Sequence, residues 1–71
     1  MIQWRQHDRY HLRSECGQFT VCRTLSGETI AYTAWRVNPR QIIECHVCDT
    51  RNSAARDEAL RACKAACEGV S

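Results

Sequence analysis

The last quarter of this sequence carries a helical pattern, and that pattern limits what the rest of the chain can fold into. Between residues 54 and 68, alanines and long side chains favour helix, and Gly69 is placed to end it. Asn52 or Ser53 is the expected N-cap. The apolar positions form one stripe at three- and four-residue spacing: Ala55, Ala59, Leu60, Cys63, Ala66 and Cys67. A helix with one apolar stripe needs one sheet face to cover.

Apolar and polar side chains alternate with a period of two along much of the preceding sequence, which is typical of half-buried strands. Gly17, Gly27 and Pro39 mark the breaks between these segments. The strands are expected at residues 10–14, 19–24, 29–36 and 41–48. The short connections favour an antiparallel meander. The predicted fold class is α+β, with a three- to four-stranded antiparallel sheet and one C-terminal helix packed on one face.

A chain of 71 residues has room for one small domain with one core. Apolar residues make up 44% and charged residues 25%, close to the average of globular proteins, so we expect a folded module. In this single domain, residues 1–9 are predicted to form a lead-in segment, residues 10–48 the sheet and residues 52–69 the helix.

The phase of the strands predicts which side chains lie on the sheet face away from the helix. With Ile43 and Cys45 toward the helix, that face contains His11, Arg13, Thr20, Cys22, Thr33, Trp35, Glu44 and His46. An exposed tryptophan among arginines and histidines is typical of an interface hot spot and is compatible with base stacking. In the alternative, Trp35 packs under the N-terminal segment with Trp4, and the arginines form an ordinary solvated face. The candidate binding residues are Trp35, Arg13, Arg23, Arg36 and His11.

Four cysteines in two pairs form the strongest pattern for a metal site. Cys45 and Cys48 are followed, after fourteen residues, by Cys63 and Cys67 on the predicted helix. Four thiolates at such spacing suit a tetrahedral zinc ion. Against zinc, Val47 disfavours the required turn, and a regular strand would put Cys45 and Cys48 on opposite faces. The main alternative is that Cys45, Cys63 and Cys67 are small apolar residues of the core, with no cofactor. Disulfides are the third alternative.

Catalysis has little support in the sequence. A cysteine–histidine pair can be assembled from Cys16 or Cys48 with His7, His11 or His46, but such pairs arise readily in a chain rich in both residue types. The sequence contains no glycine-rich phosphate loop, no nucleophile elbow and no paired-carboxylate motif. We therefore predict that the protein is not an enzyme.

The net charge of +2 does not by itself indicate nucleic acid or a membrane as partner. Six of the nine arginines lie in the first forty residues beside only three acidic residues, so this half carries +3. The N-terminal residues lack the apolar run of a secretory signal, and no stretch is long enough to span a bilayer. We expect a cytoplasmic protein without membrane contact.

Several short motifs resemble small orphan proteins of tailed phages and prophages. The motifs are Tyr10-x-Leu12-x-Ser14, Gly17-x-Phe19-Thr20-Val21-x-Arg23, Gly27, Tyr32-x-Ala34-Trp35-Arg36 and Arg56-Asp57-Glu58-Ala59 with Cys63. The resemblance implies a mobile-element origin and a β-meander closed by a helix of the form Glu-Ala-x-x-x-Cys. It brings no catalytic residues, and the pair Cys45 and Cys48 departs from its pattern. Some phage proteins of this size are anti-CRISPRs, which is an analogy of context.

Together these features predict a non-enzymatic phage or mobile-element protein that binds a host macromolecule stoichiometrically in the host cytoplasm. The most concrete version is an anti-CRISPR-type inhibitor of a host defence complex, whose partner is a protein or a ribonucleoprotein. The alternative is a small nucleic-acid-binding module, stabilised by zinc or without it. Exposed sheet edges would also allow a homodimer.

Overall fold

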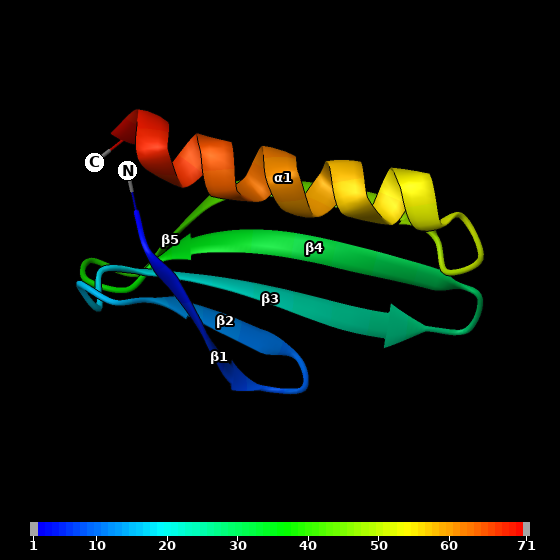
Figure 1. Ribbon diagram of the computed structural model, residues 1–71, viewed down its shortest axis with the longest axis horizontal. Coiled ribbons are helices and arrows are strands. Elements are labelled where there is room, and N and C mark those ends of the chain that lie inside the picture. Colours follow the sequence, from blue (N-terminus) through cyan, green and yellow to red (C-terminus); the bar gives the residue numbers. More distant parts are fainter. Residues whose placement is uncertain (1, 71) are drawn as a thin grey trace.

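The computed structural model describes residues 2–70, which form five β-strands followed by one α-helix (Figure 1). The elements are β1 (Trp4–Asp8), β2 (His11–Ser14), β3 (Phe19–Ser26), β4 (Thr29–Arg36), β5 (Gln41–Asp49) and α1 (Ser53–Val70). The strands build one antiparallel sheet in the order β1-β2-β3-β4-β5, so each strand pairs with its neighbour in the sequence. The predicted α+β meander with one C-terminal helix is confirmed, with one strand more than expected.

The additional strand, β1, lies in the segment that was expected to be only a lead-in. Trp4 pairs with Ser14 of β2, and the Trp4 ring packs against the core. Two residues further along, Gln6 pairs with Leu12. The polar Gln6 stands where an alternating strand would have its next apolar residue, so the period of two is not visible in the sequence of β1.

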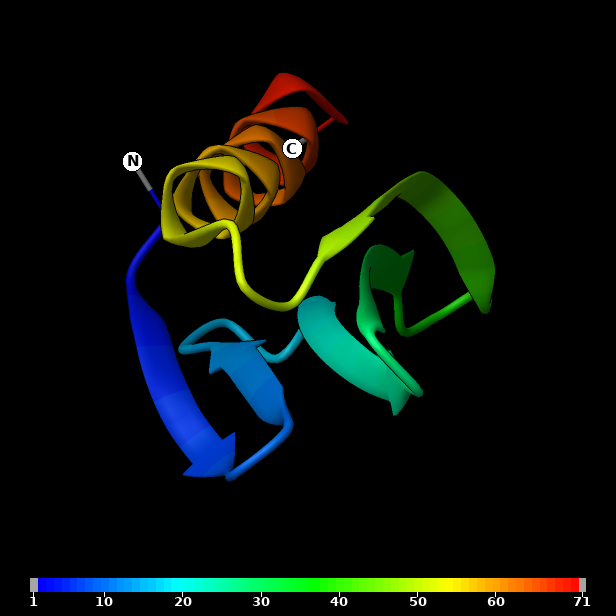
Figure 2. The same ribbon diagram turned by 90° about the vertical axis from the view of Figure 1, so that its right-hand side faces the viewer.

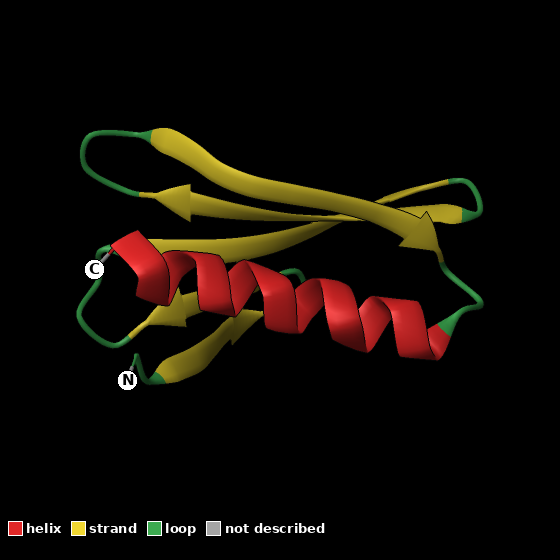
Figure 3. Cartoon of the chain, turned by 90° about the horizontal axis from the view of Figure 1, so that it is seen from above, coloured by secondary structure: helices red, strands yellow, loops and turns green. Residues whose placement is uncertain are grey.

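Helix α1 runs along one face of the sheet (Figures 1 and 3) and packs mainly against β4 and β5. Its N-terminus is capped by Asn52, whose side-chain Oδ1 accepts a hydrogen bond of 3.1 Å from the Ala55 N–H. The predicted stripe faces the sheet, with Ala59, Cys63 and Cys67 buried. The eight buried apolar residues form one cluster between helix and sheet: Phe19, Val21, Ile30, Tyr32, Ala34, Ala59, Cys63 and Cys67.

A buried serine closes the turn between β2 and β3. The hydroxyl of Ser14 accepts a hydrogen bond of 3.0 Å from the Phe19 N–H and donates one of 3.2 Å to the Phe19 carbonyl. Both polar functions of the hydroxyl are therefore satisfied although only 2% of the residue is exposed. The next turn joins β3 to β4 through two residues, and Gly27 supplies the positive φ of 61° that it needs.

Strand β5 runs in the opposite phase to the one expected from the sequence. Its register with β4 places three residues opposite buried side chains and therefore on the helix side: Glu44, His46 and Cys48. Cys45 and Val47 alternate with them and are exposed on the other face, Val47 to 65%. The expectation that Cys45 faces the helix while Glu44 and His46 face away is therefore wrong.

A β-bulge at Ile43 causes this reversal. Ala34 of β4 pairs with Glu44, while the next residue, Trp35, pairs with Ile42, so Ile43 is the extra residue of β5. Ile43 packs against the core, as expected. Because one added residue shifts the alternation by one position, every later side chain of the strand changes face.

We predict that the two apolar ends of β3 differ strongly in their contribution to stability. Phe19 is 2% exposed and Leu25 is 54% exposed, and the alternation of β3 puts both on the helix side of the sheet. Phe19→Ala should lower the free energy of unfolding by about 3–5 kcal/mol, which is much of the stability of a domain this small. Leu25→Ala, the matched control, should lower it by less than about 1 kcal/mol. Urea denaturation measures both values, and similar losses would contradict the described core.

Candidate functional site

The face of the sheet opposite α1 is covered by no helix or strand of residues 2–70, and we call it the bare face (Figure 2). The strand registers place on it Arg5, Asp8, His11, Arg13, Thr20, Cys22, Thr24, Ser26, Thr29, Ala31, Thr33, Trp35, Ile42, Cys45, Val47 and Asp49. Three of the candidate binding residues predicted from the sequence, Trp35, Arg13 and His11, therefore lie on one surface. This surface is the candidate functional site.

Trp35 is the largest side chain on the bare face and is partly buried there. Its cross-strand neighbours are Thr20 of β3 and Ile42 of β5. The indole Nε1–H donates a hydrogen bond of 3.3 Å to the Cys22 sulfur, and the Arg40 guanidinium lies 5.4 Å from the ring centroid. These two contacts fix the position of the ring on the bare face.

The surroundings of Trp35 form a shallow hollow with positive charge. The hollow is lined by His11, Arg13, Thr20, Cys22, Trp35, Arg36, Val37 and Arg40. Three of these residues are arginines and none is acidic, so no carboxylate in the lining neutralises the guanidinium groups. Val37 adds an apolar side chain that is 46% exposed. A partner that fits this hollow would bring negative charge around an apolar contact.

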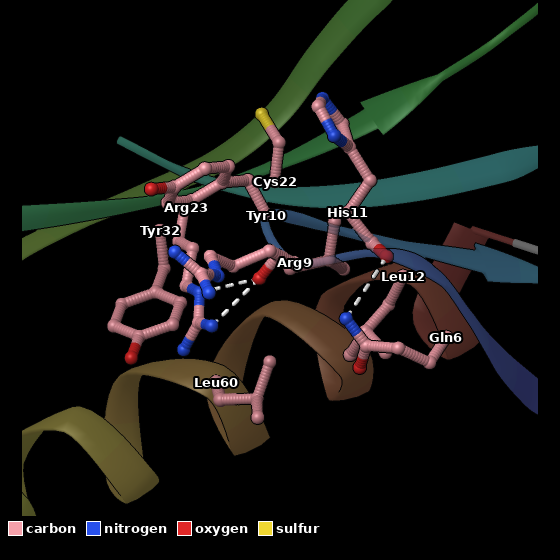
Figure 4. A pocket seen from close by; sticks show the side chains of 10 residues that line it. Gln6, Arg9, Tyr10, His11, Leu12, Cys22, Arg23, Tyr32 and Leu60 are labelled. Carbon is pink, nitrogen blue, oxygen red and sulfur yellow. Dashed lines mark hydrogen bonds between the residues drawn. The ribbon is translucent and has the colours of Figure 1, made fainter. Parts of the chain in front are cut away.

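The remaining two predicted binding residues are placed differently. Arg36 ends β4 and lines the hollow. Arg23 lies on the helix side, in a small pocket between the β1–β2 turn, β3 and α1 (Figure 4). Its Nε and Nη2 donate to the Arg9 carbonyl at 3.0 and 2.6 Å, and its guanidinium lies 5.8 Å from the Tyr10 ring centroid. Arg23 thus fixes the β1–β2 turn and does not reach the bare face.

Sequence reasoning missed three members of the site, Val37, Arg40 and Ile42. Arg40 lies in the loop after β4, and only the path of that loop brings its guanidinium back over Trp35. Ile42 precedes the bulge and pairs with Trp35, so the alternation of β5 already places it on the bare face, although it was not included in the predicted surface. Proline at position 39 indicates a break in the sheet, but no sequence pattern shows where the chain returns.

The alternative in which the two tryptophans pack together is wrong. Trp4 pairs with the buried Ser14 and packs against the core on the helix side, whereas Trp35 lies on the bare face. Glu44 and His46, which were expected beside Trp35, also lie on the helix side. There the Glu44 carboxylate contacts His46 Nε2 at 2.7 Å.

The four cysteines of the predicted zinc site are divided between the two faces. Cys45 is exposed on the bare face, 3.5 Å from the Thr33 hydroxyl, while the other three point toward the helix–sheet core. Cys63 and Cys67 are completely buried, and Cys48, rather than Cys45, packs against the same core from β5. Within residues 2–70, no group of three or more histidine, cysteine or acidic side chains is arranged to hold a metal ion. All six cysteines are free thiols.

Burial controls the chemistry of the two core thiols. It raises the pKa of Cys63 to about 12 and that of Cys67 to about 11, and the nearby negative charge of Glu44 acts in the same direction. The Cys63 thiol also donates a weak hydrogen bond to the Tyr32 carbonyl at 3.6 Å. Both side chains are therefore neutral at physiological pH and act as small apolar residues, as the second of the three interpretations of the sequence predicts for Cys63 and Cys67 but wrongly for the exposed Cys45.

With this geometry established, the chain was compared with known proteins. No family model, curated protein or solved structure matches it. The one helix found within residues 2–70 is not apolar enough to cross a membrane.

We predict that the protein loses stability in alkaline solution through its core thiols. Their pKa values are raised in the folded state from an ordinary value near 9 to about 11 and 12. The stabilisation is present below the unfolded pKa and is lost as the pH rises through the folded pKa values, because the unfolded chain ionises first. Urea denaturation under reducing conditions should show a lower free energy of unfolding at about pH 10 than at about pH 8.

The control for this prediction is Cys63→Ala, which removes one of the two thiols. The variant is expected to be less stable at every pH, since it leaves a small cavity, but its stability should fall less steeply with pH. An equal slope in both proteins would show that other groups cause the alkaline loss.

Proposed function

We propose that this protein is a non-enzymatic binding protein that attaches its bare face to an acidic, partly apolar surface of a partner protein. The observation that carries the proposal is the hollow around Trp35, where Arg13, Arg36 and Arg40 meet without any carboxylate in the lining. Aromatic and arginine side chains dominate the energy of many protein interfaces. Burying Trp35 under a partner would combine its apolar contact with charge-assisted hydrogen bonds from the arginines.

The apolar residues of the bare face support a protein partner. Ile42, 53% exposed, lies across from Trp35, and Val37, 46% exposed, lines the hollow around it. Val47, 65% exposed, lies further along the same edge strand as Ile42. Apolar side chains next to an aromatic anchor and surrounded by arginines are typical of protein–protein interfaces. Nucleic-acid interfaces are more polar and much more positively charged, and a net charge of +2 gives little general attraction to a polyanion.

The mode of action that we propose is stoichiometric occlusion of a host macromolecule. A domain of this size can cover a patch of a larger assembly without chemistry of its own. The resemblance to phage and prophage proteins makes a host defence complex the most concrete target, which corresponds to an anti-CRISPR type of inhibitor. Such a partner would be a protein or the protein part of a ribonucleoprotein in the host cytoplasm.

The second candidate is a nucleic-acid-binding module that uses the same face. Trp35 would stack on a base, and Arg13 and Arg40 would contact phosphates. The specific observation in its favour is the absence of acidic residues from the lining of the hollow. In this case zinc would contribute to stability only if it bound ligands other than the four cysteines, which lie on two faces of the sheet.

We predict that Trp35→Ala weakens binding to the protein partner by about 30-fold, the equivalent of about 2 kcal/mol for a hot-spot residue. Arg13→Ala should also weaken it, through the loss of a charged contact. Arg61→Ala is the control, because it removes the same charge from an exposed position on α1. The measurement is binding of the purified protein to purified CRISPR effector complexes at low and high salt, with titration of inhibition to an end point.

The two candidate functions give different results in this measurement. Saturation at a fixed molar ratio, with binding that persists in high salt and is lost in Trp35→Ala but not in Arg61→Ala, supports the protein partner. Affinity for a single-stranded oligonucleotide that falls steeply with added salt supports the nucleic-acid module. If Trp35→Ala and Arg13→Ala bind every tested partner as the unchanged protein does, the bare face is not the binding surface.

A further inference from the structure

Cys22 and His11 are direct neighbours across two strands of the bare face. The register of β2 and β3 pairs them, and the adjoining Arg23 N–H donates a backbone hydrogen bond of 2.9 Å to the Tyr10 carbonyl. Because hydrogen-bonded and non-hydrogen-bonded pairs alternate, His11 and Cys22 form a non-hydrogen-bonded pair, the type with Cα atoms only about 4.5 Å apart. Figure 4 shows the Cys22 sulfur and the His11 ring projecting from the same side of the sheet, away from Leu60 of α1.

Asp8 determines which ring nitrogen of His11 is available to the thiol. Its Oδ1 lies 2.8 Å from His11 Nδ1. The hydrogen bonds from His11 and from the Tyr10 N–H lower the pKa of Asp8, so this carboxylate is ionised at neutral pH and can only accept. His11 Nδ1 must therefore carry the proton, and in the neutral ring Nε2 keeps its lone pair. A carboxylate that orients a histidine in this way prepares the ring to act as a base.

The Cys22 sulfur has a hydrogen-bond donor and cationic side chains in its surroundings. The sulfur accepts the hydrogen bond from the Trp35 indole at 3.3 Å, and indole N–H groups can only donate. Arg13 and Arg40 line the same hollow, and no carboxylate does. Cys22 is only partly buried, so a small reagent can reach it from the hollow. Cysteine thiols are reactive where hydrogen-bond donors and cationic groups lie near the sulfur and a reagent can reach it.

We propose that Cys22 is a reactive thiol that undergoes exchange with small anionic disulfides, with His11 as its base and Asp8 as the positioning residue. In this reaction His11 Nε2 takes the proton of the Cys22 thiol. The thiolate attacks one sulfur of the disulfide, the new bond forms between that sulfur and Cys22 Sγ, and the disulfide bond breaks. The other half leaves as a thiolate and takes the proton from His11. Cys22 is oxidised, the departing half is reduced to a thiol, and glutathione disulfide is a suitable co-reactant.

The other cysteines of the chain provide internal references. Cys45 lies on the same face and is more exposed than Cys22, but its sulfur contacts the Thr33 hydroxyl and not a histidine. Cys16 is exposed in the β2–β3 turn, and hydrogen bonding with Ser14 lowers the pKa of its thiol independently of His11. Cys63 and Cys67 are buried and neutral.

The test follows each cysteine separately in one protein. The reduced full chain is treated with glutathione disulfide at neutral pH, the reaction is stopped with acid at intervals, and peptide mass spectrometry gives the modified fraction of Cys22, Cys45 and Cys16. Cys22 is expected to react at least about tenfold faster than Cys45. His11→Gln, which keeps a hydrogen-bonding group beside Asp8 but supplies no base, should bring Cys22 down to about the rate of Cys45. The rates of Cys45 and Cys16 should not change.

Two further measurements separate the proposed roles from a general structural effect. Arg13→Gln should slow Cys22 with the anionic glutathione disulfide but not with the uncharged hydroxyethyl disulfide. In Asp8→Asn, the long-range ¹H–¹⁵N NMR spectrum should show that the Nδ1-protonated form of the His11 ring is no longer dominant, and Cys22 should slow while the fold is unchanged. The proposal is overturned if Cys22 reacts no faster than Cys45, or if His11→Gln slows all three cysteines equally.

Discussion

The packing of one helical stripe on one sheet face is the contact on which the whole structure depends. Cys63 and Cys67 are fully buried against β4, where Ala34 is also fully buried, so small side chains meet at the centre of the interface. Small residues let the helix approach the strands closely, and the larger Phe19 and Ile30 fill the space beside them. A chain of this length can supply only one such core. Every other surface, including the second face of the sheet, is therefore left to solvent or to partners.

The bulge at Ile43 decides what that second face contains. Without it, β5 would contribute Glu44 and His46 to the bare face and Cys45 to the core, and the surface beside Trp35 would carry a carboxylate. With it, Cys45 and Val47 appear there instead, and Ile42, which precedes the bulge, stays opposite Trp35. One inserted residue thus replaces an ionic pair by a thiol and an apolar side chain on the bare face. The absence of a β5 carboxylate beside Trp35 is therefore a consequence of this irregularity.

The bare face also brings together groups that the order of the sequence keeps apart. Asp8, His11 and Cys22 belong to three consecutive parts of the meander, and pairing aligns them in one row across the sheet. Trp35 joins the row from β4 through its contact with the Cys22 sulfur. The same hollow therefore has an apolar ring for recognition and a thiol with a neighbouring base. The binding surface and the thiol chemistry are separate proposals, because the first depends on Trp35 and the second on His11.

Much of the fold and part of the site were predictable from the local pattern of side chains. The helix, its cap at Asn52 and the strands β2 to β5 follow from periodicity and turn residues, because those signals arise within a few neighbouring positions. The positions of His11, Arg13 and Trp35 on one face follow from the same alternation. Strand β1 was missed because the polar Gln6 interrupts its pattern. Cys45 and Cys48 were expected on opposite faces, but each was assigned to the wrong one because a bulge leaves no mark in composition.

The sequence by itself determined the class of fold, the stripe that forms the core and the anchor of the candidate surface. Each depends on the order of polar and apolar residue types within a short stretch of sequence. Tertiary structure alone decided the face on which Cys45 and Cys48 lie, the return of Arg40 over Trp35 and the meeting of Asp8, His11 and Cys22. These outcomes depend on strand register and on the path of a loop. Both are set by how well distant segments pack together, which no short stretch of sequence encodes.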